Sequence, residues 1–270
     1  MIRLGRQRQA SRADRHELYQ LSVQDPATEI DFIEEIWSEL RRRPAEMLRE
    51  DFCGTAITSC EWVSRDHRHY ATAIDLDAEV LAWGREHNLA SLPRDARERV
   101  HLLEENVIEA RPEDADIVLA MNFSYYLFTT RRELLTYFTQ VRAGLAADGI
   151  FFLDAYGGYD APREIVEKRD CDGFTYVWDQ ASYNPIDGLM RCNIHFEFPD
   201  GSRMEKAFSY EWRLWTLPEI RELLEEAGFG DVTVYWEGTD PESNEGNGIY
   251  EPAEVGDADP GWVCYIVAQV

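Results

Sequence analysis

Hydrophobic and polar positions along this 270-residue chain follow two different periods. Up to residue 158, short apolar runs are each followed by a segment in which apolar residues recur every three or four positions, the spacing of one helix face. The apolar runs predict strands at 45–51, 70–77, 99–106, 115–128 (a strand and the loop after it) and 150–158. The helical segments are 26–43, with Thr28 as the expected N-cap, 54–65, 78–92, and 131–149, which closes on Gly149.

A second pattern begins after residue 158. Between about Thr175 and Tyr210, polar and apolar residues alternate as in antiparallel strands, and the Asp-Gly pairs at 187–188 and 200–201 are expected to form hairpin turns. The remaining elements are a helix at 216–229 with Thr216 as N-cap and Gly228 as C-cap, strands at 231–238 and 262–270, and an acidic, solvated loop at 239–261.

These elements together predict an α/β fold, because strands alternate with helices through the first half of the chain. We expect a Rossmann-like, doubly wound, seven-stranded and mostly parallel sheet with an antiparallel β insertion after the fifth strand. One domain is expected over residues 1–270, with an N-terminal helical cap at 1–43 and the β-rich insertion at 160–215.

The charge balance narrows the classes of partner. The chain has 52 Asp and Glu against 27 Lys and Arg, a formal net charge of −25. A nucleic-acid surface needs clustered Lys and Arg, so this balance argues against nucleic acid as a partner and is compatible with small neutral or cationic molecules. No apolar run reaches the roughly 18 residues that cross a bilayer, so no membrane partner is expected.

The five cysteines are an odd number and have no C-x-x-C spacing, which indicates buried thiols in a reducing compartment. We therefore expect a cytoplasmic protein without a disulfide framework. The six histidines are scattered along the chain, and no metal site is expected. The oligomeric state stays open, with a homodimer among the options.

The stretch LREDFCGTAITSCEW, residues 48–62, lies where the first predicted strand gives way to a helix. Gly54 allows close approach of a ligand to the backbone, and Thr55 is a candidate cap for the helix. Asp75 ends the second strand about 20 residues later, the spacing at which a carboxylate accepts the hydroxyls of a ribose. An adenosine-containing ligand follows from this arrangement.

Diphosphate ligands fit the same stretch poorly. A dinucleotide needs several glycines so that the backbone can close on the pyrophosphate, whereas Phe52 and Ala56 flank Gly54 here. No G-x-x-x-x-G-K-[ST] sequence is present either. A ligand with ribose and adenine but without phosphates is therefore favoured.

The same stretch resembles motif I of the class I S-adenosylmethionine-dependent methyltransferases of the small-molecule type. "MLREDFCGTA" matches that motif around Cys53-Gly54-Thr55, "AIDLD" is similar to motif II, "LLEENV" to motif III with Asn106 in place of the usual Asp, and "IVLAMNFSYYLF" to motif IV. The resemblance implies S-adenosylmethionine as the cofactor. The cofactor-binding residues that it implies are Glu50, Phe52, Cys53, Gly54, Thr55, Ala56, Asp75, Leu76, Asn106, Val107 and Asn122, together with Tyr19 before the first long helix.

Residues at the ends of the fourth and fifth strands are candidates for the acceptor site. Asp154 and Tyr125 are the candidate catalytic residues, and the alternative for Asp154 is a strand-end cap or a solvated carboxylate. The insertion, interpreted as a substrate lid, carries aromatic residues that could box a cationic amine or could form its own core. The candidate substrate-binding residues are Ser124, Tyr156, Trp178, His195, Tyr210 and Arg213.

The sequence thus predicts transfer of a methyl group from S-adenosylmethionine to an N or O atom of a small molecule. Two alternatives stay open: a non-catalytic regulatory protein that binds adenosine or S-adenosylmethionine, and an NAD-dependent oxidoreductase.

Overall fold

The computed structural model describes residues 8–111, 114–242 and 246–270. The chain forms two compact units. One, here called the sheet unit, is Asp25–Gly158 with Trp215–Val270, and the other, the insertion unit, is the chain up to Gln24 with Tyr159–Leu214. Of the segment expected as one helical cap at 1–43, residues 8–24 therefore belong to the insertion unit and residues 25–43 to the sheet unit.

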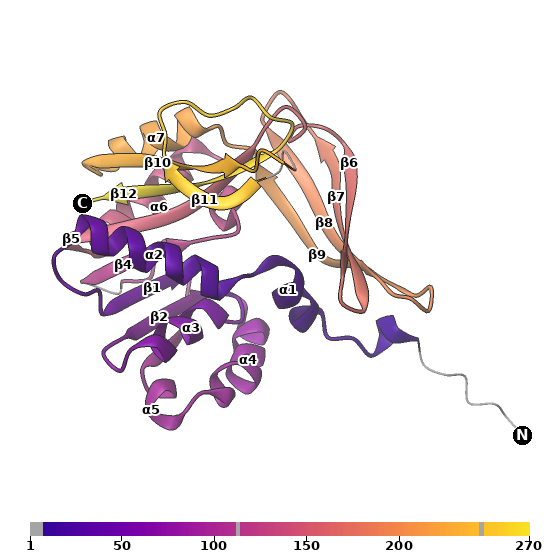
Figure 1. Cartoon of the computed structure of the whole chain (residues 1–270), viewed down its shortest axis with the longest axis horizontal. Coiled ribbons are helices and arrows are strands. Elements are labelled where there is room, and N and C mark those ends of the chain that lie inside the picture. Colours follow the sequence, from indigo (N-terminus) through magenta and orange to yellow (C-terminus); the bar gives the residue numbers. More distant parts are fainter. Residues whose placement is uncertain (1–7, 112–113, 243–245) are drawn as a thin grey trace, which may run out of the picture. The chain divides into compact units, whose positions relative to one another are not determined.

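The sheet unit contains a mixed sheet of eight strands among the described residues, in the order β11-β10-β12-β5-β4-β1-β2-β3 (Figure 1). Its strands are β1 (Met47–Asp51), β2 (Tyr70–Asp75), β3 (Val100–Glu104), β4 (Ala115–Ala120), β5 (Leu145–Gly157), β10 (Asp231–Thr239), β11 (Gly246–Pro252) and β12 (Trp262–Gln269). The pairs among β1 to β5 are parallel, while β10, β11 and β12 are antiparallel to their neighbours. The predicted Rossmann-like, mostly parallel sheet is confirmed.

The strand count differs from the expected seven because part of the loop 239–261 forms β11. Its register places Tyr250 opposite Glu237 of β10. The Tyr250 ring lies 4.6 Å from that of Tyr265 in β12, which anchors this edge strand to the sheet.

The helices of the sheet unit connect these strands. They are α2 (Pro26–Leu40), α3 (Ile57–Arg65), α4 (Ala78–His87), α5 (Arg94–Arg97), α6 (Arg131–Gly144) and α7 (Leu217–Glu226), with 3₁₀ turns η2 (Leu89–Ser91) and η3 (Ser124–Leu127). Asp25, not Thr28, caps α2, since its carboxylate accepts the Thr28 N–H. The expected helix 131–149 ends at Gly144, because Leu145 is already extended and begins β5. Thr216 caps α7 in a capping box with Glu219, as predicted.

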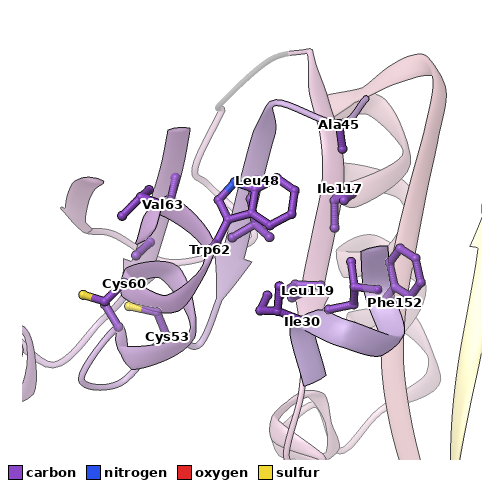
Figure 2. Packing of buried hydrophobic residues seen from close by; sticks show 14 of the residues in the cluster. Ile30, Ala45, Leu48, Cys53, Cys60, Trp62, Val63, Ile117, Leu119 and Phe152 are labelled. Atoms are coloured by element: carbon purple, nitrogen blue, oxygen red, sulfur yellow. The ribbon is translucent and has the colours of Figure 1, made fainter. Parts of the chain in front are cut away.

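One large core fills the face of the sheet that α2 and α3 cover. Figure 2 shows Ile30 of α2 near Leu119 of β4, and Trp62 of α3 beside Leu48 of β1. The opposite face packs against α6 and α7, where Phe151 of β5 contacts Phe138 and Phe229. Helices on both faces leave the carboxyl ends of the parallel strands as the place where polar loops gather.

The insertion unit is built on an antiparallel sheet in the order β6-β7-β8-β9. Its elements are η1 (Gln9–Ser11), α1 (Arg15–Val23), β6 (Ile165–Cys171), β7 (Phe174–Tyr183), β8 (Leu189–Glu197) and β9 (Arg203–Arg213). Gly188 and Gly201 have φ of 74° and 75°, as the expected hairpin turns require. Strand β6 was not predicted, because its polar, exposed sequence lacks a clear apolar period.

No helix among the residues that the structure describes is both long enough and apolar enough to span a membrane.

Candidate functional site

The loops at the carboxyl ends of β1 and β4 lie at the point where the strand order reverses. From β1 the chain passes through α3 to β2 on one side, whereas β4 and β5 lie on the other. In open α/β sheets, ligands bind in the crevice outside the carboxyl ends at this switch point.

The loop after β1 has an alternating left-handed backbone. Phe52, Gly54 and Ala56 have φ of 56°, 53° and 54°, although only one of the three is glycine. For a residue with a side chain this conformation costs roughly 1–2 kcal/mol, so surrounding contacts must impose it. The backbone thus adopts the shape that a glycine-rich loop would adopt at this place.

Strand β2 fixes this loop through two hydrogen bonds. The Cys53 N–H donates to the Ile74 carbonyl at 2.9 Å, and the Gly54 N–H donates to Asp75 Oδ2 at 2.8 Å. Asp75 Oδ1 accepts the Asp77 N–H at 2.9 Å. Burial raises the pKa of Asp75 above its usual value. Each carboxylate oxygen can accept two hydrogen bonds, so Asp75 keeps capacity for a ligand's hydroxyls.

Helix α4 supports the loop from behind, which the sequence analysis missed. A Cβ placed on Gly84 would lie 2.4 Å from the Thr55 carbonyl oxygen, so only glycine allows this approach. The same oxygen accepts a hydrogen bond from Asn88 Nδ2 at 2.9 Å. The signal that could have revealed this contact is a glycine in the middle of a helical pattern.

Glu50, not Thr55, satisfies the start of α3. Its Oε2 accepts the Ser59 N–H at 2.9 Å and the Ser59 hydroxyl at 2.5 Å. The N-cap position itself is Ala56, which has no side chain to serve as a cap. Glu50 is buried, and burial raises its pKa to about 7. The expectation for Thr55 as cap is therefore wrong.

Cys53 is a packing residue and not a reactive thiol. Its side chain is 2% exposed, and burial raises its pKa well above the usual value, so the thiol stays protonated. Cys60 is also buried and faces the sheet.

The loop after β4 is strained in the same way. Asn122 and Phe123 have φ of 58° and 56°, and with Phe52 and Ala56 they are four of the six non-glycine residues with positive φ in the described ranges. Their N–H groups donate to Asp154 Oδ2 and Oδ1, each at 2.8 Å. Strain gathered in two loops at one edge of a sheet indicates a functional site.

These bonds change the role expected for Asp154. Its side chain is 7% exposed and both carboxylate oxygens accept loop N–H groups, while burial raises its pKa to about 7. Asp154 therefore holds the β4 loop in shape, which is a positioning role.

Tyr125 also forms part of this loop's support. The side chain is 0% exposed, and its hydroxyl donates to the Asp154 carbonyl at 2.7 Å. Ser124 donates its hydroxyl to the Met121 carbonyl at 2.8 Å within its own turn. Tyr156 packs its ring 4.9 Å from that of Phe123, so it supports the β4 loop.

Residues that follow β2 and β3 include both polar and apolar side chains. Leu76 directly follows Asp75 and is 70% exposed, an apolar side chain available to a flat ligand. Asn106 is half-buried, and its Oδ1 accepts the Ile108 N–H at 3.0 Å. Val107 is buried, and its carbonyl accepts a hydrogen bond from Arg49 Nη2 at 3.0 Å.

A buried ion pair on the other face of β1 was also missed. Arg49 Nε lies 2.7 Å from Asp51 Oδ1, and both side chains are at most 1% exposed. The Tyr137 hydroxyl of α6 donates to Asp51 Oδ2 at 2.8 Å. The group thereby ties the end of β1 to α6 and, through Val107, to the segment after β3.

The remaining candidate residues lie in the insertion unit. The Tyr19 ring lies 4.9 Å from the Phe208 ring, and the Trp178 ring lies 6.4 Å from the Tyr210 ring. These contacts favour the interpretation of the aromatic residues as part of that unit's own core.

His195 is buried in the same unit. Its Nδ1 accepts the Lys206 N–H at 3.0 Å, and its Nε2 lies 3.4 Å from Asp179 Oδ2. A substrate-binding role for His195 is therefore not supported. Arg213 ends β9 opposite Leu189.

A cavity of about 430 Å³ lies at the opposite, amino-terminal end of the sheet. Its lining includes Trp37 and the arginines Arg43, Arg65 and Arg68. Each of these three arginines pairs with at least one carboxylate. Arg41 and Arg42 also line the cavity, and Arg41 donates to the Asp148 carbonyl and to Gln269 Oε1. Among the described residues, no group of three or more His, Cys, Asp or Glu could hold a metal ion.

The geometry of the β1 loop fits an adenosine-containing cofactor. A Cβ on Gly54 would meet no atom within 4 Å, so open space lies above the left-handed backbone at this point. Asp75 and the exposed Leu76 flank that space along the chain. Sheet order, the strained loop and the acidic end of β2 together define the fold of the class I S-adenosylmethionine-dependent methyltransferases.

Comparison with solved structures gives the same fold. The chain is similar to an S-adenosylmethionine-dependent methyltransferase from Clostridium acetobutylicum, with 18% identity, 94% of this chain and 97% of the other covered, and a TM-score of 0.68. It is similar to an amino pentose methyltransferase of calicheamicin biosynthesis from Micromonospora echinaspora, whose structure holds S-adenosylmethionine, at 15% identity, 94% and 95% coverage and a TM-score of 0.65.

A sugar N-methyltransferase from a Streptoalloteichus species has 16% identity, 95% and 92% coverage and a TM-score of 0.63. No family model matches the sequence, and no curated protein matches it. At these identities the comparisons show the fold of the chain.

Proposed function

We propose that this protein binds S-adenosylmethionine and transfers its methyl group to a nitrogen atom of a small-molecule acceptor. The observation that carries the proposal is the β1 loop, in which Phe52, Gly54 and Ala56 all have a left-handed backbone and Gly54 donates to Asp75. This is the shape of a cofactor cradle, retained although two of its three left-handed positions have side chains.

Different residues of the sheet unit would contact the ribose, the adenine and the methionine part of the cofactor. Asp75 would accept the ribose hydroxyls with the lone pairs that its two backbone partners leave free. Leu76 would pack on the adenine ring, and Asn106 and Val107 would meet its edge. The Phe52–Ala56 backbone and Asn122 would line the methionine part, while Glu50 keeps α3 in place behind them.

An amine is the acceptor that fits this chemistry best. A hydroxyl acceptor needs a base, yet the carboxyl group of Asp154 is buried and holds the β4 loop, and the buried Tyr125 hydroxyl donates to a backbone carbonyl. A neutral amine attacks with its own lone pair, so alignment with the donor methyl group in a dry site supplies most of the catalysis. Two of the similar structures are described as an amino pentose methyltransferase and a sugar N-methyltransferase.

Trp178 and Tyr210 belong to the insertion unit's aromatic core but are only half-buried, and their exposed ring faces are the proposed source of acceptor recognition. Tyr210 and Trp212 stack with ring centroids 4.5 Å apart, and Trp178 lies 6.1 Å from Trp212. Aromatic faces of this kind attract cationic or amine-bearing molecules. The proposed place of action is the cytoplasm, which suits five free cysteines.

Binding measurements test the cofactor assignment. S-Adenosylmethionine and S-adenosylhomocysteine should raise the melting temperature, and NAD should not. Asp75→Ala should weaken both ligands by about tenfold or more, because it removes an acceptor of the ribose hydroxyls. Asp95→Ala, which removes an exposed carboxylate from α5, serves as the control and should leave both affinities unchanged.

Turnover measurements then separate an enzyme from a binding protein. Labelled S-adenosylmethionine should transfer its methyl group to members of an amine library more readily than to matched alcohols and phenols. Stabilisation by NAD alone would overturn the proposal. Tight cofactor binding without transfer to any acceptor class would support a regulatory protein instead.

A further inference from the structure

The cavity of about 430 Å³ at the amino-terminal end of the sheet, from here on called the arginine cavity, is built entirely within the sheet unit. The last turns of α2 and α3 and the segments before β1 and β2 contribute most of its lining. Its buried apolar lining consists of Trp37, Ala45, Trp62 and Ile117, and Figure 2 shows the last three. The volume lies within the range of roughly 300–1,000 Å³ that small-molecule sites have, so an organic ligand fits.

Arginine is the commonest residue in this lining. Five arginines and two acidic residues line the cavity, namely Arg41, Arg42, Arg43, Arg65 and Arg68 with Glu34 and Asp66. In the whole chain, acidic residues outnumber basic ones by 52 to 27, so this lining departs from the rest of the molecule. Residues 41–43 are also the only run of three consecutive Lys or Arg in the sequence, a signal that the net charge of −25 conceals.

Three of the arginines are held in place by carboxylates. Arg43 donates to Asp148 from Nε and Nη2, at 2.9 and 2.6 Å, and to Asp116 from Nη2 at 2.7 Å. Arg65 and Arg68 form ion pairs as well. Because these charges are balanced, the three side chains serve as fixed walls of the cavity.

Arg41 and Arg42 have no such ion pair. Arg41 donates from Nε to the Asp148 carbonyl at 2.6 Å, and from Nη1 to the Leu40 carbonyl and Gln269 Oε1, each at 2.9 Å. All three acceptors are uncharged groups. The Arg42 side chain is exposed and forms neither an ion pair nor a hydrogen bond with the described part of the chain. Two consecutive guanidinium groups therefore line the cavity without a carboxylate of their own.

Stabilisation of the end of α2 accounts for only one of these two residues. Cations near a helix C-terminus offset the partial negative charge of the last carbonyl groups. Arg41 has this role, since its N–H donates to the Trp37 carbonyl at 2.8 Å and its Nη1 donates to the Leu40 carbonyl. Arg42 contacts neither carbonyl, so the helix end does not explain its place at the cavity.

We propose that the arginine cavity binds a small organic phosphate, with the phosphate group on Arg41 and Arg42. A guanidinium group donates two parallel N–H bonds to an oxyanion. Two guanidinium groups can share the three terminal oxygens of a phosphate ester, whereas a carboxylate offers only two oxygens. The apolar part of the lining gives the organic body of the ligand a surface to bury.

This site is separate from the cofactor cradle, and the inference does not depend on the proposed function. Ala45 precedes β1 at the cavity, and Phe52 follows β1 at the cradle. A strand of this length spans roughly 17 Å, so a phosphate in the cavity lies far from a methyl group at the cradle. The organic phosphate is therefore a second ligand and not the methyl acceptor, and both sites can be occupied together.

Titration calorimetry at low ionic strength with three probes tests the class of ligand. Phenyl phosphate combines a phosphate with an apolar body, benzoate has a carboxylate instead, and inorganic phosphate lacks the body. Phenyl phosphate should bind with a Kd below about 1 mM, and the other two about tenfold more weakly. Saturating S-adenosylmethionine should leave the phenyl phosphate Kd unchanged. In NMR spectra, phenyl phosphate should shift the indole N–H signals of Trp37 and Trp62 and not that of Trp178 in the insertion unit.

Substitutions at Arg42 test the residue that carries the inference. Arg42→Gln should weaken phenyl phosphate about tenfold and leave the melting temperature unchanged, because the side chain has no partner in the described chain to lose. Arg42→Lys retains the charge without the planar fork and should recover part of the affinity. Arg132→Gln is the matched control, because it removes an arginine from an exposed position of α6, and it should leave the Kd unchanged.

Several outcomes would overturn the inference. Equal loss of affinity in Arg42→Gln and Arg132→Gln would mean that overall charge, and not this cavity, attracts the anion. Equal Kd values for the three probes would mean that the site does not select an organic phosphate. Displacement of phenyl phosphate by S-adenosylmethionine, or no binding up to about 10 mM, would also contradict it.

Discussion

Backbone strain at single residues is concentrated in two loops of the sheet unit. Phe52 and Ala56 have the left-handed backbone that glycine adopts easily, and so do Asn122 and Phe123 after β4. The Phe52 ring packs 5.5 Å from Tyr137, so its side chain points into the protein and away from the cradle. Two side chains in place of glycines therefore leave the ligand face of the loop open.

This geometry limits what could be predicted at the residue scale. The nearness of Gly54 and Asp75 followed from spacing, because the ends of neighbouring parallel strands meet at one edge, but the hydrogen bond between them was not predicted. The roles of Asp154 and Tyr125 did not, since their partners come from a loop about 30 residues away in sequence. Because Phe52 adopts the left-handed backbone with its ring directed into the protein, the absence of glycine at this position is only a weak argument against a dinucleotide. The open ligand face makes the NAD comparison in the binding test essential.

Gly84→Ala tests how strongly the cradle depends on close packing. The added Cβ would lie 2.4 Å from the Thr55 carbonyl oxygen, so the loop or α4 must shift. We expect a loss of about 1–3 kcal/mol in unfolding free energy. We also expect weaker binding of S-adenosylmethionine, measured by calorimetry.

The control for this substitution is Ala82→Gly, the reverse change at an exposed position of the same helix. It should cost about 1 kcal/mol of stability and leave cofactor affinity unchanged. Unchanged affinity in Gly84→Ala would show that the cradle does not depend on this contact.

At the scale of elements, regular local patterns were enough for most helices and parallel strands. Two strands escaped prediction because long-range pairing, and not apolar period, defines them. Strand β6 is an exposed edge strand of charged residues, and β11 comes from a glycine-rich acidic loop that pairs with β10. Helix α6 ends five residues before the expected Gly149, because Leu145 pairs with Ala115 and β5 therefore begins at Leu145 instead of residue 150.

The ion pair of Arg49 and Asp51 connects three elements, and breaking it is expected to loosen them. Asp51→Asn leaves the buried Arg49 without its ionic partner and weakens the bond from Tyr137. We expect a loss of about 3–5 kcal/mol in unfolding free energy, measured by urea denaturation.

An apolar replacement of the whole pair provides the comparison. Arg49→Met with Asp51→Leu removes both charges together and should recover much of the loss. If the single and double variants were equally unstable, the pair would matter through its shape and not through its charge.

At the scale of the whole molecule, the β-rich insertion expected at 160–215 corresponds to the Tyr159–Leu214 part of the insertion unit. The sequence did not reveal that residues 8–24 belong to the same unit, where Leu18 packs in its aromatic core. No local signal in the leader specifies a partner about 150 residues away. The net charge of −25 likewise belongs to the molecule as a whole, because acids are spread along the chain.

The pH dependence of stability follows from how these acids are placed. Glu29, Glu50 and Asp154 have raised pKa values of about 8, 7 and 7, whereas in the unfolded chain they would titrate near their ordinary values. The folded state therefore holds protons that the unfolded state releases, and this contribution to stability is complete below about pH 4 and is lost as the pH rises toward 8. Arg43 lowers the pKa of Asp148, whose contribution is instead lost as the pH falls below about 4.

Melting temperatures recorded from pH 4 to pH 9 at constant ionic strength should therefore be highest near pH 5 and fall toward pH 8. Each of the three groups contributes a slope of at most about 1.4 kcal/mol per pH unit. Glu29→Gln should flatten the fall and melt higher than the unchanged protein at pH 8, because a neutral amide replaces a charge that burial disfavours. Glu35→Gln should keep the original slope. A melting temperature that is constant between pH 5 and pH 8, or equal slopes in both variants, would mean that these carboxyls are ionised and compensated in the folded protein.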